Sequence, residues 1–394
     1  MDTLTLIANP GSASRKYALY RDDTHLASLH FEYVEGRIIC TSYAHDRHQP
    51  VDVDLHDLGD VAGQVLPILK QHNLMSDQET ITRIGLRIVA PSSYFLKDHI
   101  LDDEPIAKLR ELEPRAPLHI GASLRELETL RDVFPNATIV GVSDSAFHAH
   151  KPDYAWNYGV RLQDADRFEI KRFGYHGISV ASVVNTLQQS EKLPPKVIVA
   201  HLGSGASVTA VSGGKSLDNT MGYSPLEGLI MATRVGSIDP AATNMLQTQL
   251  HLNDEQMEDY LNSHSGLLGL SEISSAINEL LEHEANGNHR AKLALDTYTF
   301  VAQKAIGSMT AALGGVDMLI FTGAVGERSA LMRERIVERL HFLDFALEAN
   351  ENSSTTNPLK PVRISQLAKS KPIYVVPTDE AGEMNRCVKS ILNS

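Results

Sequence analysis

Several residue types and patterns on which whole classes of protein depend are scarce or missing in this sequence. Its 394 residues include two cysteines, Cys40 and Cys387, too few for a disulfide framework, and neither C-x-x-C nor H-E-x-x-H occurs, which argues against zinc. No apolar run approaches the roughly eighteen residues that a membrane helix needs, and residues 1–10 lack the basic region of a signal peptide. We therefore expect a cytoplasmic protein with reduced thiols and no membrane partner.

Basic residues are also fewer than acidic ones. The chain has 36 Lys and Arg against 49 Asp and Glu, a formal net charge of −13. Sequence-independent nucleic-acid binding rests on many Lys and Arg contacts to phosphates, so we expect no nucleic-acid partner. The net charge does not exclude small anionic substrates, because a few clustered arginines can make the potential positive locally on a surface that is negative overall. His148 and His150 lie two positions apart, but such a pair alone is weak evidence for a metal.

The length exceeds that at which a single core keeps growing, so we expect two domains. A strand, a glycine-serine turn and a second strand are expected near residue 4 and again from residue 196. This repetition suggests an internal duplication, and two unrelated hairpins are the alternative. Asp144 is expected just past a strand, where ligand residues of α/β folds are often found. The other expected elements are helices over 104–113, 119–132, 291–313, 329–340 and 378–392, strands over 81–89, 317–323 and 371–377, and a polar surface loop over 350–362.

The stretch 219–240 follows no regular period, because three glycines and a proline interrupt it. Arg234 lies in an otherwise apolar and small-residue part of this stretch. A buried charge without a partner would cost several kcal/mol. We therefore expect Arg234 to meet an anion, either Asp239 or a ligand.

Residues 317–340 predict a strand, a glycine loop and a helix, an arrangement that presents main-chain N–H groups and a helix dipole to a phosphate. A plain tight turn would give the same pattern, and the loop does not match the Walker motif of P-loop NTPases. The two hairpin turns add hydroxyl and charged donors. These donors are Ser12, Ser14 and Lys16 in the first turn, and Ser204 and Ser207 in the second.

Suppose that a phosphoryl group is transferred and that its acceptor is a small carboxylate; two arginines would then suit the reaction. A carboxylate is already ionised at pH 7 and needs no general base. The carboxylate and the phosphoryl group are both anions, so placing them for in-line attack requires that their charge is neutralised. Arg87 and Arg234 could grip phosphoryl oxygens bidentately, and His176 could donate a hydrogen bond. Asp144 and Glu380 could hold Mg²⁺.

Each of these residues also has a plainer interpretation. Arg87 could pair with a surface carboxylate, Asp144 could cap the next segment, and His176 could be a satisfied core residue. Glu380 could complement a helix dipole behind a Thr378 cap.

Taken together, five motifs resemble the acetate kinase family, also called short-chain carboxylate kinases. The resemblance runs from about residue 4 to residue 386 in the order and spacing of the family. The motifs are N-P-G-S-A-S-R-K at 9–16, R-F-G-Y-H-G-I-S at 172–179, H-L-G-S-G-A-S at 201–207, F-T-G-A-V-G-E-R at 321–328 and P-T-D-E at 377–380.

The resemblance implies an α/β protein with the duplicated ribonuclease H-like two-domain fold of the actin, hexokinase, sugar kinase and acetate kinase superfamily. It implies an N-terminal domain of 1–147 with 378–394, a nucleotide-binding domain of 148–377, and an active site in the cleft between them. The expected enzyme is a Mg²⁺-dependent homodimer that interconverts acetate or propionate plus ATP with acyl phosphate plus ADP.

The motifs and the resemblance together assign roles to individual residues. The expected catalytic residues are Arg87, Asp144, His176 and Arg234, and the expected metal ligands are Asn9 and Glu380. The acyl pocket would be formed by Val89, Leu118, Tyr175, which replaces the usual Phe, and Pro225. Phosphate or nucleotide contacts are expected from Ser12, Ser14, Lys16, His201, Gly203, Ser204, Gly205, Gly323, Gly326 and Glu327.

The chain also departs from the family pattern beside these residues. Leu86 and 90–92 replace the histidines and glycines of H-R-V-V-H-G-G, and 274–278 read S-S-A-I-N where the family has S-S-D-x-R. Arg328 replaces the Asn of G-E-N, and Ser204 that of H-L-G-N-G. The residues expected to carry out the transfer are thus retained, whereas the pocket for the nucleotide base and one wall of the acyl site differ from the family. A kinase with another nucleotide or pyrophosphate as donor, and a ligand-binding paralogue with weak catalysis, are the alternatives.

Overall fold

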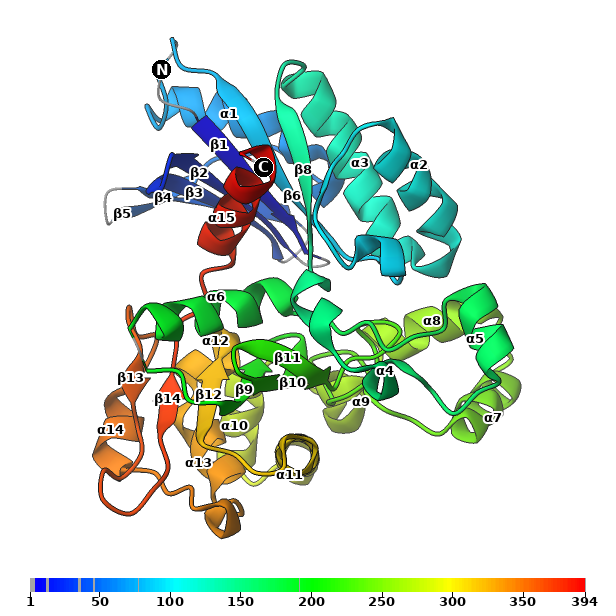
Figure 1. The fold of residues 1–394 in the computed structure, drawn as a ribbon, viewed down its shortest axis with the longest axis vertical. Helices are drawn as coiled ribbons and strands as arrows, with labels where there is room; N and C mark the ends of the chain where they lie inside the picture. Colours follow the sequence, from blue (N-terminus) through cyan, green and yellow to red (C-terminus); the bar gives the residue numbers. More distant parts are fainter. Residues whose placement is uncertain are drawn as a thin grey trace. The chain divides into compact units, whose positions relative to one another are not determined.

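A computed structural model of the chain describes residues 4–11, 14–34, 37–44, 47–76, 78–190 and 192–393, except for the side chains of 117–119. The chain divides into two compact units, which are described separately: an N-terminal unit of Met1–Ala146 with Asp379–Ser394, and a C-terminal unit of Phe147–Thr378. Each unit is built around one mixed β-sheet (Figure 1).

The sheet of the N-terminal unit has the strand order β5-β4-β3-β2-β1-β6-β8-β7 among the described residues. The central strands β1, β6 and β8 are parallel, whereas β1 to β5 form an antiparallel meander and β7 pairs antiparallel with β8. The strands are β1 (Leu4–Pro10), β2 (Ser14–Arg21), β3 (Thr24–Val34), β4 (Arg37–Ala44), β5 (Arg47–Val51), β6 (Ile81–Ile88), β7 (His99–Ile100) and β8 (Thr138–Ser143).

Helices cover both faces of this sheet. The strand β1 alternates, so that Leu4, Leu6 and Ala8 join the core beneath α1 (Ala62–Gln71), α2 (Asp103–Leu112) and α3 (Pro117–Val133). The opposite face carries α15 (Glu380–Leu392) (Figure 1). A Cβ at Gly85 would lie 2.8 Å from the Val388 side chain and 2.9 Å from that of Ile7, so α15 packs directly on the backbone of β6. Asn9 follows the period of Ile7 and therefore lies on the α15 face.

The sheet of the C-terminal unit repeats this arrangement, with the order β11-β10-β9-β12-β14-β13. Its strands β9, β12 and β14 are parallel, and β9 to β11 form an antiparallel meander. The strands are β9 (Lys196–Leu202), β10 (Ala206–Ser212), β11 (Lys215–Asn219), β12 (Met318–Thr322), β13 (Val362–Arg363) and β14 (Ile373–Val375). A meander of three strands followed by two parallel strands thus occurs in both units, which confirms the expected duplication.

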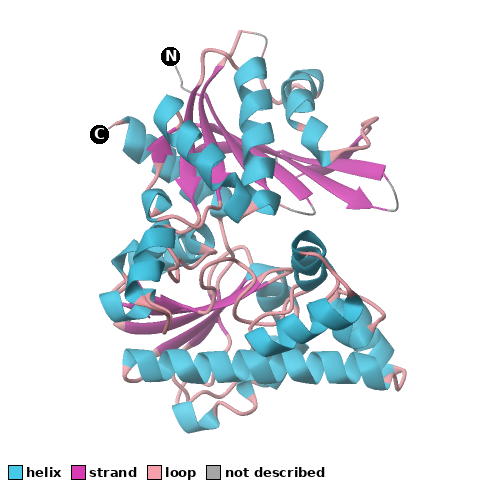
Figure 2. Ribbon diagram, turned by 90° about the vertical axis from the view of Figure 1, so that its right-hand side faces the viewer, coloured by secondary structure: helices cyan, strands magenta, loops and turns pink. Residues whose placement is uncertain are grey.

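The helix α6 (Gly177–Gln189) packs its valines on Val197, Val199 and Val211 of this sheet. The long helix α11 (His289–Leu313) crosses the other face (Figures 1 and 2). The other helices of the unit are α4 (Asp153–Trp156), α5 (Leu162–Phe168), α7 (Pro240–Leu250), α8 (Asp254–Ser263), α9 (Gly266–Ser271), α10 (Ile277–Ala285), α12 (Gly323–Arg328), α13 (Ala330–Val337) and α14 (Ala349–Ser354). Short 3₁₀ turns in the chain lie at Leu58–Asp60, Ser93–Phe95, Glu113–Arg115, Ala146–His150 and His341–Leu343.

One local expectation was wrong in part and another was wrong. The polar segment 350–362 was expected to be a surface loop; residues 355–361 have no regular structure, but residues 350–354 belong to α14. The polar side chain of Asn352 turns inward to accept a hydrogen bond from the buried Arg333. The last helix is capped by Asp379 rather than Thr378, because the Asp379 carboxylate accepts the Gly382 N–H.

Candidate functional site

Four expected site residues of the N-terminal unit form one hydrogen-bonded cluster, which we call the Arg87 cluster. Arg87 donates to Asp144 Oδ2 at 2.8 Å and to Asn9 Oδ1 at 3.2 Å, and Asn9 donates to Glu380 Oε2 at 2.7 Å. Asn9, Arg87 and Asp144 lie at or just past the carboxyl ends of the parallel strands β1, β6 and β8. Glu380 begins α15. Parallel strands bring their carboxyl ends to one edge, which is where α/β folds bind ligands.

Burial determines the electrostatics of this cluster. Asp144 is 1% exposed, so its ion pair with Arg87 is an interior pair rather than the surface pair that we considered as an alternative. Burial alone would lower the pKa of Arg87, but the carboxylates of Asp144 and Glu380 raise it above its ordinary value. The guanidinium is therefore firmly charged and held in one orientation.

The oxygen donors of this cluster suit Mg²⁺. Asn9, Asp144 and Glu380 offer amide and carboxylate oxygens, the ligands that this hard cation prefers, and Mg²⁺ keeps several waters when it binds. Within the described ranges, no group of three or more His, Cys, Asp or Glu side chains could hold a metal ion. The donor set fits a cation shared with a phosphate better than an all-protein metal cage.

The hairpin of β1 and β2 presents further expected donors. Ser14 begins β2, and its carbonyl accepts the Gly11 N–H at 2.9 Å. Lys16 pairs directly with Asn9 across the hairpin and is exposed, so both side chains lie on the same face. Ser12 lies outside the described residues.

Sequence reasoning missed a buried polar group beneath this hairpin. Tyr17 donates to Glu126 of α3, and Nε of Arg15 lies 3.7 Å from the same carboxylate. Glu126 is 2% exposed, and burial raises its pKa. These contacts fix β2 against α3.

In the C-terminal unit, the rings of two histidines lie close together, with an angle of 34° between their planes. The rings of His176 and His201 have centroids 4.2 Å apart. His176 Nδ1 hydrogen-bonds the hydroxyl of Ser207 at 3.0 Å, and His201 Nδ1 that of Ser179 at 2.8 Å. His176 adopts φ 58 where it caps α6. The serines thus orient both rings through Nδ1.

Arg234 approaches His176 at the turn between β9 and β10. A Cβ placed on Gly205 would lie 3.0 Å from His176 Nε2 and 3.5 Å from Arg234 Nη1, so both side chains converge on this glycine. Arg234 also donates to the Pro225 carbonyl at 3.2 Å, while Asp239 accepts the Ala241 N–H and caps α7. Within the turn, Gly203 N–H donates to the Gly205 carbonyl at 2.9 Å, and Ala232 N–H donates to the Ser204 carbonyl at 3.1 Å.

The residues 323–326, which were expected to form a glycine loop, instead begin the short helix α12 directly after β12. We keep the name glycine loop for this segment. Gly323 has φ +79, and a Cβ there would lie 2.7 Å from the Leu202 carbonyl oxygen, so only glycine fits. Glu327 is buried, and its Oε1 accepts the N–H groups of Gly323 at 2.9 Å and of Thr378 at 3.1 Å. The Glu327 carboxylate therefore holds the loop in place, a contact that the motif did not reveal.

A second residue that the motifs did not reveal supports this loop. Arg333 of α13 is fully buried and makes five hydrogen bonds to uncharged acceptors. Its acceptors are the carbonyls of Gly326 and Glu327, the side chain and carbonyl of Asn352, and the carbonyl of Thr355. Burial lowers the pKa of Arg333 to about 10, which leaves it protonated at pH 7. Arg333 thus joins the glycine loop to α14.

The expected acyl-pocket residues belong to different elements. Val89 directly follows β6 and is half-buried, and Leu118 lies in α3 with its side chain outside the described part of the structure. Tyr175 is 1% exposed and Pro225 is buried. His148 is buried against the Tyr175 carbonyl at 3.0 Å and the Ser216 hydroxyl at 2.8 Å, a structural role that disfavours the metal interpretation of the His148 and His150 pair.

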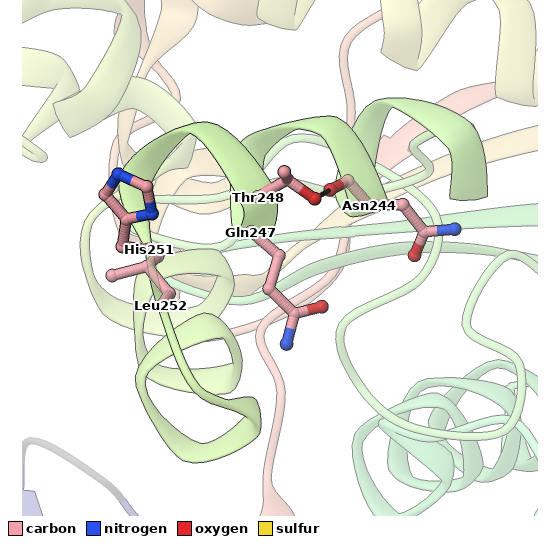
Figure 3. Close-up of a pocket in the computed structure, with 5 residues that line it drawn as sticks. All are labelled: Asn244, Gln247, Thr248, His251 and Leu252. Carbon is pink, nitrogen blue, oxygen red and sulfur yellow. Dashed lines mark hydrogen bonds between the residues drawn. The ribbon is translucent and has the colours of Figure 1, made fainter.

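An open pocket of about 570 Å³ lies at the end of α7 (Figure 3). Its lining residues are Asn244, Gln247, Thr248, His251 and Leu252, none of which was expected at the site. Gln247 donates to Asp254 and Thr248 to the Asn244 carbonyl, so these polar groups already have partners.

Comparisons with known proteins agree on one family. A model of the acetokinase family matches residues 4–385. An acetate kinase of Clostridium botulinum (strain Okra / Type B1) is 34% identical over 98% of both chains, and one of Caldanaerobacter subterraneus is 35% identical over 98% of this chain and 99% of its own. The crystal structure of Porphyromonas gingivalis acetate kinase superposes with a TM-score of 0.86 at 31% identity, covering 99% of this chain and 100% of the other. A propionate kinase from Francisella tularensis gives a TM-score of 0.89 at 29% identity, covering 98% and 99%.

Proposed function

This chain belongs to the acetokinase family and is a kinase, and we propose that it transfers a phosphoryl group reversibly from ATP to the carboxylate of acetate or propionate. The family and the duplicated α/β fold predicted from the sequence are both confirmed. The observation that carries the proposal is the Arg87 cluster, a charged guanidinium held by Asn9 and Asp144 at the carboxyl ends of three parallel strands.

The proposed reaction needs no proton transfer. An oxygen of the ionised carboxylate attacks the γ-phosphorus, and the bond from that phosphorus to the bridging oxygen of ATP breaks as ADP leaves with its electron pair. Arg87 and Arg234 neutralise the charge on the transferring oxygens, and His176, oriented through Nδ1 by Ser207, donates from Nε2. Mg²⁺, held by Glu380 and Asn9 and through water by Asp144, would supply charge neutralisation on the phosphates.

An acyl-hydroxamate assay tests the proposal. Acetate, propionate and butyrate are each offered with ATP, GTP or pyrophosphate in the presence of Mg²⁺. We expect hydroxamate from acetate or propionate with ATP. Product with another donor alone would favour the altered-donor alternative that Arg328 and residues 274–278 suggest, and no product from folded protein would favour a ligand-binding paralogue.

Replacement of Glu380 should weaken metal use. Glu380→Gln keeps the Asn9 contact sterically but removes one negative charge from the proposed metal site. We expect the Mg²⁺ concentration for half-maximal activity to rise about 10-fold or more, measured by Mg²⁺ titration at fixed ATP. Glu111→Gln, on the exposed side of α2, is the control. An unchanged Mg²⁺ dependence would remove Glu380 from the metal site.

Replacement of Gly205 should disturb His176 and Arg234 without unfolding the chain. The Gly205→Ala methyl group would press on His176 Nε2 at 3.0 Å. Because small displacements of catalytic groups are costly, we expect kcat to fall about tenfold. Gly307→Ala in α11 is the matched control, because a Cβ there meets no heavy atom within 4 Å. Full activity in Gly205→Ala would show that the two side chains need no such close placement.

We further propose that the enzyme is a cytoplasmic homodimer. No helix in the described ranges is long and apolar enough to cross a membrane. The helix α7 buries none of its residues within the chain, and Met245 and Leu250 are 61% and 48% exposed. These side chains would suit a contact with a second copy. Light scattering should give twice the chain mass of 43.2 kDa, and a monomer would contradict this assignment.

A further inference from the structure

Two tyrosine hydroxyls hold both main-chain polar groups of one loop residue. Tyr223 donates its N–H to the Tyr158 hydroxyl at 2.8 Å, and its carbonyl accepts the Tyr175 hydroxyl at 2.7 Å. Tyr223 lies past the end of β11, in a stretch without regular secondary structure. Side chains therefore supply the support that a sheet or helix gives elsewhere.

The Tyr158 hydroxyl is itself held in place by Glu227 and Arg172. It donates to Glu227, whose other carboxylate oxygen accepts from Arg172. The guanidinium of Arg172 lies 5.3 Å from the centre of the Tyr158 ring, over its face. A Cβ at Gly222 would lie 1.8 Å from the Glu227 carboxylate and 2.1 Å from the Tyr158 hydroxyl. The group is therefore packed tightly against the backbone that precedes Tyr223.

Tyr175 is also held through its main chain. Its main-chain carbonyl is contacted by His148 at 3.0 Å and by the Asn219 amide at 3.3 Å. Its ring is 1% exposed, so ring and hydroxyl have one position. Pro225 follows Tyr223 by two residues, and its carbonyl accepts from Arg234 at 3.2 Å. One side chain thus joins the backbone before His176 to the loop that contacts Arg234.

We propose that the hydroxyls of Tyr175 and Tyr158 set the acyl-size limit of this enzyme by fixing the Tyr223–Pro225 main chain as a rigid wall. The inference rests on the proposed function and on the family resemblance, which assigns Tyr175 and Pro225 to the acyl pocket. The Tyr175 ring forms one wall, and its hydroxyl holds the other in place. A longer acid would need Pro225 to move, which would stretch the hydrogen bonds at Tyr223.

Tyr175→Phe removes the hydroxyl and keeps the ring, and Tyr158→Phe removes the acceptor of the Tyr223 N–H. Loss of one such hydrogen bond corresponds to about a fivefold change in an equilibrium. We expect the ratio of kcat/KM for acetate to that for butyrate to fall about fivefold in each variant, through KM for the acid, with KM for ATP unchanged. Tyr154→Phe, at a ring that is 81% exposed, is the matched control. An unchanged ratio in both variants would overturn the inference.

Amide hydrogen exchange gives a readout that does not depend on turnover. The Tyr223 amide and its neighbours in 219–228 should exchange several-fold faster in Tyr175→Phe and Tyr158→Phe than in the wild type, and at the wild-type rate in Tyr154→Phe. Unchanged exchange in an active kinase would overturn this inference alone. A wild-type protein that phosphorylates no carboxylate would overturn the proposed function, and with it the size limit.

Discussion

Arg234→Ala is expected to lower kcat by about 10²- to 10³-fold while the chain stays folded, because removal of one preorganised donor to a developing charge has effects of this size. The structure directs Arg234 toward Gly205 beside His176, and its hydrogen bond to the Pro225 carbonyl fixes the approach of the guanidinium. Two of the contacts that hold the side chain are to the Pro225 carbonyl and to the Met231 sulfur. Their loss should cost stability only about 1–2 kcal/mol.

Arg234→Lys separates charge from geometry. Lysine retains the positive charge but cannot grip two oxygens with a planar fork, so we expect it to recover only part of the lost activity. Arg161→Ala, whose side chain is 80% exposed, is the control and should behave as the wild type. Initial rates should be measured together with thermal unfolding. A wild-type rate in Arg234→Ala would remove this residue from the mechanism.

Arg333→Met is expected to destabilise the C-terminal unit by about 4 kcal/mol or more. Methionine fills much of the volume but leaves five hydrogen-bond interactions unmade in the interior, and each buried acceptor that loses its partner costs about 1–3 kcal/mol before relaxation. The free energy of unfolding in urea measures this loss. Because Gly326 and Glu327 are among the acceptors, activity should fall even at temperatures at which the variant remains folded.

Arg339→Met is the matched control for this prediction, because Arg339 is exposed just beyond the same helix. Its free energy of unfolding should stay within about 0.5 kcal/mol of the wild type. A similarly small change in Arg333→Met would mean that the loop and α14 do not depend on the buried guanidinium.

The Arg87 cluster shows which site residues can be predicted from strand patterns in the sequence. The sequence of β1 alternates between Leu4, Leu6 and Ala8 on one face and Asn9 on the other, and Asp144 directly follows an apolar strand. Strand ends could therefore be recognised from local pattern, together with the motifs that carry the family resemblance. The catalytic and binding roles of these residues remain predictions, although the structure brings Asn9, Arg87, Asp144 and Glu380 together.

The supporting contacts could not be predicted in the same way. Glu126 reaches Tyr17 across 109 positions of the chain, and Tyr158 reaches Glu227 across 69. Such pairs depend on how the elements pack, and nothing local in the sequence distinguishes Glu126 from the exposed carboxylates of the same helix. The expected loop was wrong at 350–354 for the same reason, because Asn352 of the helix there accepts a hydrogen bond from Arg333, 19 positions earlier in the chain.

Transfer to a carboxylate oxygen is the central claim, and ³¹P NMR of the product formed from ATP and acetate labelled with ¹⁸O in both oxygens tests it most directly. If a carboxylate oxygen attacks the phosphorus, the acyl phosphate carries one ¹⁸O bonded to phosphorus and its signal is shifted by the isotope. Inorganic phosphate as the sole product, or an acyl phosphate without label at phosphorus, would contradict the account.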